Sequence, residues 1–424
     1  MFNRFIYSNL KIIIFKFFSV VNSSIKNFAN FVERPKSIYI LSVTQTLVWA
    51  GLYYIFPALF AKWELSLNFT KTELTSAFTT AIIISSIIAP VIGRQIDNDH
   101  GQKILIFFTT FGAICLFCLS YVNSITMFYI IWCMIGISLS GSLYEPCFAY
   151  VTKKRGKESK NAIILITLVA GFAGTISFPV ANILAEIFDW RFSLRFFSLL
   201  IILFVVPFIY IATSLEEKSD SISDKKQKKV KKYNIKNDLI QFKFVFLFIS
   251  FLTLTLSHGS VVTHIIPLLL ERKLFDGLEV LFSSLIGPMQ VFGRLAMIAL
   301  QERKLSINSI SILIFLFKAF AVGCLLFAGN NIFLIALFIM FMGAGAGMTS
   351  ISRAVVVADL MGYERFASIS GIIAVGAIGG SAIAPIFGAQ LWEYGGYDLM
   401  LKIVLIILFI GLINYLTALK LSKK

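Results

Sequence analysis

The sequence predicts an all-α polytopic membrane protein in which 12 transmembrane helices form two pseudo-symmetric six-helix bundles. Of the 424 residues, 58% are hydrophobic and only 14% are charged, whereas about 25% are charged in soluble domains. Twelve apolar runs are each long enough to cross a hydrocarbon core of roughly 30 Å. These runs cover residues 38–61, 72–92, 104–122, 126–150, 161–184, 193–214, 244–270, 279–301, 307–328, 331–357, 366–391 and 398–419.

Short motifs recur at matching places in the two halves of the chain, and this repetition predicts the pseudo-symmetry. The matching pairs are Gly93-Arg94 at the end of the second run with Gly293-Arg294 in the eighth, and Gly174 and Pro179 in the fifth with Gly380 and Pro385 in the eleventh. The fifth and eleventh runs are also rich in small residues, which let helices pack closely. Two like-oriented halves predict a binding site at their interface, near the middle of the membrane.

The segments around the bundles are basic, and they set the expected orientation. Residues 37–214 form the first predicted bundle and 244–420 the second, joined by a lysine-rich linker over 215–243. We expect residues 1–36 to be a basic arm with a helix on the membrane surface, and 421–424 to be a short tail. Most of the 38 basic residues fall on the side that would hold both termini and the linker, which predicts that this side is cytoplasmic. The net charge of +16 therefore indicates orientation and membrane-surface attraction rather than nucleic-acid binding.

A polar loop between the second and third runs carries the most distinctive motif. Gly93 permits close helix packing, and Asp97 lies where its carboxylate can accept from helix N-terminal amides or pair with Arg94 or Lys103. Gly93, Asp97, Gly101 and Lys103 resemble the loop between the second and third helices of the major facilitator superfamily. The resemblance implies that this loop, including Arg94, acts in gating and conformational change.

Two positions of this loop depart from the family pattern, and two residues elsewhere extend it. His100 stands where relatives often carry a glycine, and Gln102 replaces a usual basic residue. Glu145, near the cytoplasmic end of the fourth run, resembles the acidic residue that pairs with this loop in relatives. Arg353 holds the matching place in the tenth run, so we expect both residues to act in gating.

Three further motifs narrow the resemblance to the monocarboxylate transporter branch of this superfamily and its bacterial relatives. They are Tyr53-Tyr54-Ile55-Phe56-Pro57 in the first run, His264-Ile265-Ile266-Pro267-Leu268 in the seventh, and Ile286-Gly287-Pro288-Met289-Gln290-Val291-Phe292-Gly293-Arg294 in the eighth. The resemblance implies that Arg294 holds the carboxylate of the substrate. The internal repeat favours a different interpretation, because it makes Arg294 the counterpart of Arg94, a residue at the end of a loop.

The residues that couple protons in that branch are missing here. Ala58 stands where the branch has a lysine in the first helix, and Gln290 stands where it has an acidic residue one turn before the arginine. The aspartate-glycine-tryptophan signature that opens the first helix in that branch is also absent. Proton coupling by a lysine–aspartate route is therefore not supported.

Other ionisable residues inside the apolar runs are candidates for proton coupling. His258 and His264 lie in the seventh run, and Lys318 lies near the middle of the ninth. Ionisable groups within a membrane are rare and commonly functional, and histidine titrates near neutral pH. Glu145 is a further candidate. The alternative for each is that the side chain only bonds to a neighbouring helix.

These features predict a secondary active transporter of the bacterial cytoplasmic (inner) membrane that works by alternating access. We expect the substrate to be a small organic mono- or dicarboxylate. Arg294 would bind it, with His258, Tyr53, Tyr54 and Gln290 as further substrate-binding residues. The expected partners are this small molecule, a coupling proton or ion and the lipid bilayer, and the protein is expected to be a monomer.

Two other functions remain open. One is a proton-driven exporter of amphiphilic or toxic compounds, which the phenylalanine-rich helices and Gly171, Gly174 and Pro179 in the fifth run favour. The other is a sensor or assembly partner that does not transport. The sequence has no metal-ligand cluster, phosphate-binding loop or nucleophile–base pair, so we expect neither an enzyme nor a bound cofactor or metal.

Overall fold

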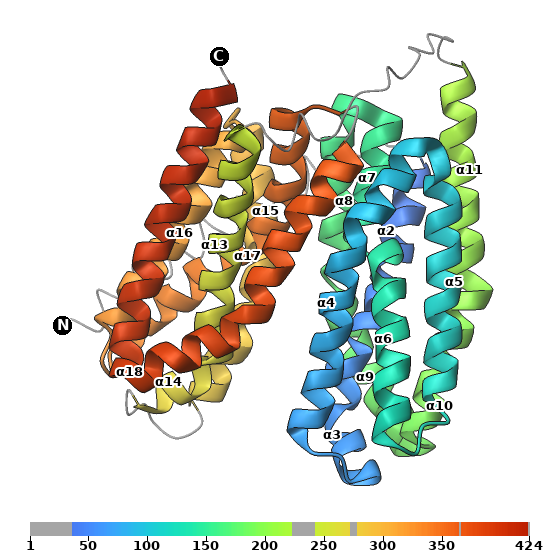
Figure 1. The fold of residues 1–424 in the computed structure, drawn as a ribbon, viewed down its shortest axis with the longest axis horizontal. Helices are drawn as coiled ribbons and strands as arrows, with labels where there is room; N and C mark the ends of the chain where they lie inside the picture. Colours follow the sequence, from blue (N-terminus) through green and yellow to red (C-terminus); the bar gives the residue numbers. More distant parts are fainter. Residues whose placement is uncertain (1–35, 223–241, 272–277, 364–365, 423–424) are drawn as a thin grey trace, which may run out of the picture.

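The structure is a computed structural model that describes residues 36–222, 242–271, 278–363 and 366–422, and this part of the chain is helical (Figure 1). The first bundle consists of α2 (Lys36–Val48), η1 (Trp49–Tyr53), α3 (Ile55–Leu67), α4 (Lys71–Gln95), η2 (Ile96–His100), α5 (Gly101–Leu119), α6 (Ile125–Ser142), α7 (Tyr144–Arg155), η3 (Gly156–Glu158), α8 (Ser159–Ala170), α9 (Ala173–Ile187), α10 (Trp190–Leu200), η4 (Ile201–Val205) and α11 (Val206–Ile222). The second bundle consists of α13 (Phe242–Thr263), α14 (Ile265–Glu271), α15 (Leu278–Glu302), α16 (Ile307–Leu326), α17 (Ile332–Met361) and α18 (Phe366–Ser422).

The predicted membrane-spanning runs are mostly helical in the described residues. Nine helical segments in this part of the chain are long and apolar enough to cross a membrane. Thr72–Leu119 contains the second and third predicted runs, Phe366–Ser422 contains the eleventh and twelfth, and α15 corresponds to the eighth. The long helix α18 turns at Gly395 and Gly396, where Gly396 has a φ of 71° that favours glycine. The predicted fold of 12 transmembrane helices is confirmed.

Several spans are interrupted near their middle, and the interruptions position side chains at the centre of the molecule. The first span contains the π-helical turn η1 between α2 and α3. Such turns insert one extra residue into a helix and often occur at functional sites. The fourth span breaks at Leu143, between α6 and α7, and the fifth breaks at Gly171 and Phe172, between α8 and α9.

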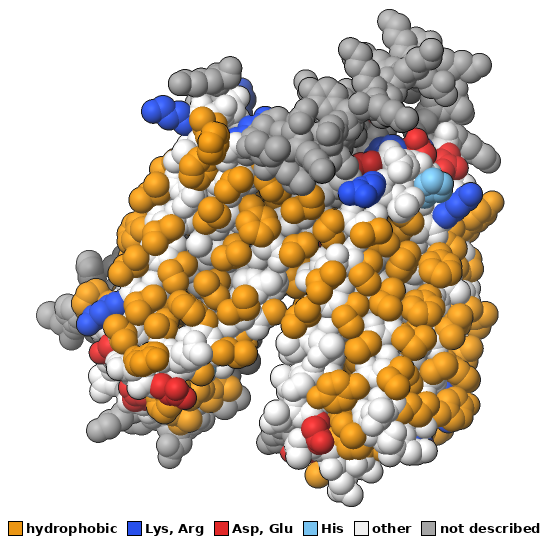
Figure 2. Space-filling view, in the orientation of Figure 1, with side chains coloured by type: hydrophobic (Ala, Val, Ile, Leu, Met, Phe, Trp, Pro, Cys, Tyr) orange, Lys and Arg blue, Asp and Glu red, His pale blue; other side chains and the backbone are white. Residues whose placement is uncertain are grey.

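The two bundles contact each other near one edge and part toward the other. Across the interface, α4 packs against α18, α7 against α17 and α18, and α8 against α15 and α17. Figure 2 shows a cleft that opens toward the edge where α3 and α14 lie in Figure 1. The connection between α4 and α5 lies at the opposite, closed edge. The visible face carries a broad apolar band, with charged side chains concentrated near the two edges, as expected for a protein surrounded by lipid.

Glycines allow the closest helix contacts, both within and between the bundles. A side chain at Gly136 of α6 would overlap the backbone of Ala81 in α4, and one at Gly347 of α17 would overlap the backbone of Gln290 in α15. These are equivalent helix pairs in the two bundles, which supports the predicted internal repeat. Between the bundles, a side chain at Gly93 of α4 would overlap the carbonyl oxygen of Ala367 in α18.

The last helix of the first bundle extends into the predicted lysine-rich linker. Helix α11 continues to Ile222, so residues 215–222 are helical. The buried carboxylate of Glu216 anchors this part of α11 to the first bundle, because it accepts from Arg155 of α7, 2.8 Å from Nε, and from the hydroxyl of Ser37 in α2. The predicted basic arm before residue 36 and most of the linker lie outside the described residues.

Candidate functional site

At the closed edge, Asp97 of the first bundle contacts the N-terminus of α18 in the second. Its carboxylate accepts hydrogen bonds from the backbone N–H groups of Ala367, over 3.3 Å, and Ser368, over 2.9 Å, and from the Ser368 hydroxyl. The first amides of a helix have no partner within the helix, and the helix dipole favours a negative charge there. Of the two arrangements that the sequence allowed for Asp97, the structure therefore has the contact with helix amides.

Lys153 of α7 holds the segment around Asp97 in place. Its ammonium group donates to the carbonyl oxygens of Ile96 and Asp97, and it pairs with the carboxylate of Asp99 over 2.6 Å. Asp99 has a φ of 67°, a left-handed conformation that aspartate tolerates better than most residues. The contacts with Lys153 therefore fix the turn that presents Asp97 to α18.

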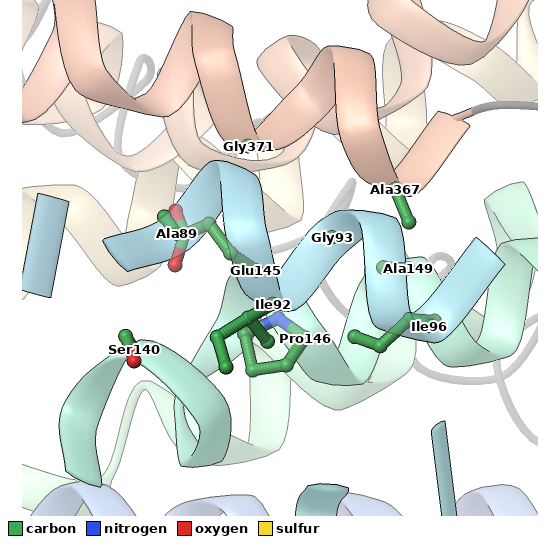
Figure 3. Close-up of a pocket in the computed structure, with 10 residues that line it drawn as sticks. All are labelled: Ala89, Ile92, Gly93, Ile96, Ser140, Glu145, Pro146, Ala149, Ala367 and Gly371. Carbon is green, nitrogen blue, oxygen red and sulfur yellow. The ribbon is translucent and has the colours of Figure 1, made fainter. Parts of the chain in front are cut away.

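A second contact between the bundles lies close by. Glu145 of α7 and Arg353 of α17 form an ion pair, and both side chains are mostly buried. Figure 3 shows a small cavity beside this pair, between α4, α7 and the start of α18. Its lining residues are Ala89, Ile92, Gly93, Ile96, Ser140, Glu145, Pro146, Ala149, Ala367 and Gly371. Gly93, Asp97, Glu145 and Arg353, four of the residues expected to act in gating, thus lie at the closed edge of the interface.

The other residues of the predicted gating loop make local contacts or face outward. Gly101 is buried, and a side chain there would lie 2.7 Å from the ring of Tyr150. Arg94 and Lys103 are exposed, and neither forms an ion pair with the described residues. Gln102 donates to the hydroxyl of Thr213 over 2.8 Å, which ties the loop to α11.

Arg294 lies near the middle of the molecule, at the interface between the bundles. It belongs to α15 and is only 9% exposed. One terminal nitrogen, Nη1, lies so close to Gly171 that any side chain at Gly171 would overlap it. Gly171 follows α8, which is 12 residues long, so the contact lies about 18 Å along the helix from its start. Arg294 thus lies near the middle of the candidate membrane span Ser159–Ile187.

Two tyrosines of the first bundle lie near the Arg294 guanidinium. Tyr54, which follows η1, and Tyr144, at the start of α7, are both within electrostatic range of it. The ring of Tyr54 also lies beside Gly174, because a Cβ there would be 3.5 Å from Tyr54 Cε1. We call Arg294, Tyr54, Tyr144, Gly171 and Gly174 the central site.

The environment of Arg294 distinguishes it from its counterpart in the internal repeat. Arg94 is exposed near the end of α4, whereas Arg294 is buried well inside α15. The Nε of Arg294 is also buried and has no hydrogen-bond acceptor among the described residues. Gln290 lies one helical turn before Arg294, and both side chains are partly or largely buried. The two arginines of the repeat thus occupy different environments.

His258 and Lys318 lie close to each other in the second bundle. Lys318 of α16 is 1% exposed, and its Cγ would be 3.1 Å from a Cβ at Gly345 of α17. His258 of α13 is within electrostatic range of Lys318, and its Nδ1 lies 3.4 Å from the sulfur of Met342. In the described part of the chain, no carboxylate pairs with Lys318. The structure thus groups His258 with Lys318 rather than with Arg294.

His264 contacts a different helix. Its Nε2 lies 3.0 Å from the carbonyl oxygen of Pro385 in α18, and its ring packs against Gly388. A histidine that donates to a backbone carbonyl joins two helices of one bundle. This contact agrees with the alternative considered for His264, in which the side chain only bonds to a neighbouring helix.

The sequence also matches a known family. The model of the Major Facilitator Superfamily matches residues 41–320, well over half of the chain. The chain belongs to the Major Facilitator Superfamily. An uncharacterized transporter of Buchnera aphidicola subsp. Baizongia pistaciae (strain Bp) is 24% identical over 194 residues, which cover 43% of this chain and 46% of that relative. The match therefore spans less than half the length of this curated relative.

Solved structures of other members of the superfamily share the fold. FucP in its outward conformation aligns with a TM-score of 0.66 and 15% identity, over 90% of this chain and 98% of that one. A bacterial homologue of the iron transporter ferroportin, in an outward-facing state, aligns with a TM-score of 0.68 and 14% identity, over 91% and 100% of the two chains. At this level of identity the likeness shows the fold alone.

Some features of the site in this superfamily member were not predicted from the sequence. The pairing of Glu145 with Arg353, the packing of Gly171 against Arg294 and the proximity of His258 to Lys318 all depend on how distant helices pack. Trp49 was also missed, although it begins η1 and its ring lies 4.6 Å from that of Tyr144. The clustering of aromatic residues at Trp49, Tyr53 and Tyr54 was a usable signal for Trp49.

Proposed function

We propose that this member of the superfamily is a secondary transporter for small organic anions, and that Arg294 binds the carboxylate of the substrate. The observation that carries this proposal is the environment of Arg294. Its guanidinium is buried where the two bundles meet, and no carboxylate of the described residues pairs with it. Such a charge is costly within a membrane unless it has a partner, and an anionic substrate supplies one.

The chemistry of arginine supports a carboxylate as that substrate. A guanidinium presents a planar set of N–H donors that grips a carboxylate through two parallel hydrogen bonds. The Nε of Arg294, which has no acceptor among the described residues, belongs to one such set together with Nη2. Arg294 lies on one bundle, and Tyr54 and Tyr144 lie on the other. A substrate bound between them would contact both bundles, so that a movement of one bundle relative to the other would change these contacts.

The contacts at the closed edge support alternating access. We infer that this edge faces the cytoplasm of a bacterium, as the distribution of basic residues predicts, so that the cleft in Figure 2 opens outward. The contacts of Asp97 with Ser368 and of Glu145 with Arg353 would then hold the cytoplasmic gate shut. Opening the gate requires these contacts to break while the bundles close over the cleft.

We infer that any proton coupling involves His258 and Lys318. The two groups lie within electrostatic range of each other in the interior of the second bundle. Two neighbouring positive charges repel each other strongly in a low-dielectric interior. Loss or gain of a proton by either group would therefore change the forces between α13 and α16.

A proton-driven exporter of amphiphilic compounds is the second candidate, and the aromatic rings near the central site favour it. A thermal-shift screen of the purified protein separates the two, because a ligand stabilises the state that binds it. The screen compares small carboxylates with hydrophobic cations such as tetraphenylphosphonium. We expect carboxylates to raise the unfolding temperature and the cation to have no effect. Stabilisation by the cation alone would overturn the organic-anion proposal in favour of the exporter.

A further inference from the structure

We infer that the substrate of the central site is an aromatic carboxylate, whose ring lies among aromatic side chains of the first bundle while its carboxylate meets Arg294. This inference rests on the proposed function, because it assumes that Arg294 binds the carboxylate. It adds to the proposed function the chemical nature of the part of the substrate that lies beyond the carboxylate. The observation behind it is a group of four rings next to the guanidinium, which we call the ring cluster: Trp49, Tyr53, Tyr54 and Tyr144.

The rings contact one another continuously. Trp49 lies 4.9 Å from Tyr53 and 4.6 Å from Tyr144, and Tyr53 lies 5.4 Å from Tyr54. These separations fall within the range of favourable aromatic pairs. The π-helical turn η1 brings Trp49 and Tyr53 into the same group, since both lie within its five residues. All four rings are half-buried rather than enclosed in the core.

The ring cluster faces the second bundle at the position of Arg294. Tyr54 and Tyr144 are each within electrostatic range of the guanidinium, and each contacts Trp49. Gly171 lies at the break between α8 and α9, and Gly174 lies in the first turn of α9. Because neither glycine has a side chain, Arg294 approaches Gly171 closely and the ring of Tyr54 approaches Gly174 closely.

The positions of the charge and the rings select among carboxylates. A carboxylate on Arg294 places the rest of the molecule beside Tyr54 and Tyr144. A short aliphatic acid reaches the guanidinium but leaves the rings uncovered. A flat aromatic ring can stack on them or meet their edges, which a saturated ring of the same size does less well. We therefore expect the site to prefer an aromatic ring over a saturated one.

The test measures the dissociation constants of phenylacetate and cyclohexylacetate for the purified full-length protein, with phenylacetamide as the uncharged control. We expect phenylacetate to bind about fivefold more tightly than cyclohexylacetate, and phenylacetamide to bind only weakly. Tyr144→Phe should keep the preference for the aromatic ring, and Tyr144→Leu should remove most of it. Tyr210→Leu is the matched control, because Tyr210 of α11 is 58% exposed and lies outside the ring cluster.

The outcomes separate this inference from the proposed function. Equal affinities for phenylacetate and cyclohexylacetate, both weakened by Arg294→Lys, would overturn the aromatic preference and leave the organic-anion proposal standing. Binding of neither carboxylate, together with binding of tetraphenylphosphonium, would overturn both. A preference that survives Tyr144→Leu unchanged would also contradict the inference, because the ring cluster would then not be its source.

Discussion

The backbone N–H of Ser368 in the second bundle donates a hydrogen bond of 2.9 Å to the carboxylate of Asp97 in the first. The contact joins a loop between two helices of one bundle to the start of a helix in the other. If the bundles separate at this edge during transport, as we propose, the contact opposes opening, and the negative charge of Asp97 strengthens it through the N-terminus of α18. The charge of Asp97 and the dipole of α18 thus act together to hold the two bundles in contact at this edge.

Asp97→Asn is expected to open the gate without unfolding the protein. Removing the charge loses its interaction with the N-terminus of α18, typically about 1 kcal/mol, so the open fraction should rise roughly fivefold. The measurement is maleimide labelling of Ala149→Cys. Ala149 is buried and lines the small cavity beside Glu145 and Arg353, so that a cysteine there should react faster when the gate opens. Asp189→Asn is the matched control, because Asp189 caps α10 within one bundle. Equal labelling of both variants would show that the charge of Asp97 does not hold the gate closed.

Exchanging the charges of Glu145 and Arg353 should restore a gate that either single change weakens. Glu145→Arg or Arg353→Glu alone places two like charges in contact across the bundles, which should increase labelling of Ala149→Cys about tenfold. The double variant regains an ion pair and should return close to the original labelling. Additive effects of the two changes would indicate that the pair is not coupled in the closed state.

Gly93→Ala is expected to prevent full closure of the gate. The added methyl group would overlap the carbonyl oxygen of Ala367, and relieving such overpacking commonly costs about 1–3 kcal/mol. Gly287→Ala is the control, because a Cβ at Gly287 of α15 meets nothing within 4 Å. Crosslinking between cysteines placed in α4 and α18 measures closure. Unchanged crosslinking in Gly93→Ala would show that the close approach is not needed.

Lys318→Met should stabilise the protein while impairing proton-coupled transport. Methionine resembles the lysine stem in length, so it should fill the space beside Gly345 without the cost of burying an unpaired charge, which is large in an apolar interior. Thermal unfolding gives the first readout, and the pH dependence of substrate binding gives the second. A large loss of stability with unchanged pH dependence would make Lys318 a structural residue.

Composition and apolar length were sufficient to predict the fold. Each predicted run contains enough consecutive apolar residues to span the bilayer, and this requirement leaves little choice of secondary structure. The breaks within the spans were not predicted. The π-helical turn at Trp49–Tyr53 has no local sequence requirement comparable to that of a proline or a capping residue.

The sequence can nominate individual residues for a site, but it does not show which of them pair. Glu145 and Arg353 were both expected to act in gating, but they are 208 residues apart, and one sequence does not show which distant residues meet. Similarly, the sequence treats Arg94 and Arg294 as equivalent members of a repeat. Their difference arises from Gly171 and Tyr54, which belong to the opposite bundle and surround only Arg294.

The most direct test of the central claim compares Arg294→Lys with Arg94→Lys in carboxylate affinity and folded yield. Lysine keeps the charge but loses the planar donors that grip a carboxylate. We predict that Arg294→Lys lowers the affinity for phenylacetate at least about tenfold, or roughly 1.4 kcal/mol, with a normal folded yield, and that Arg94→Lys leaves the affinity unchanged. If both variants bind the carboxylate as tightly as the original protein, Arg294 is a structural residue and the account is contradicted.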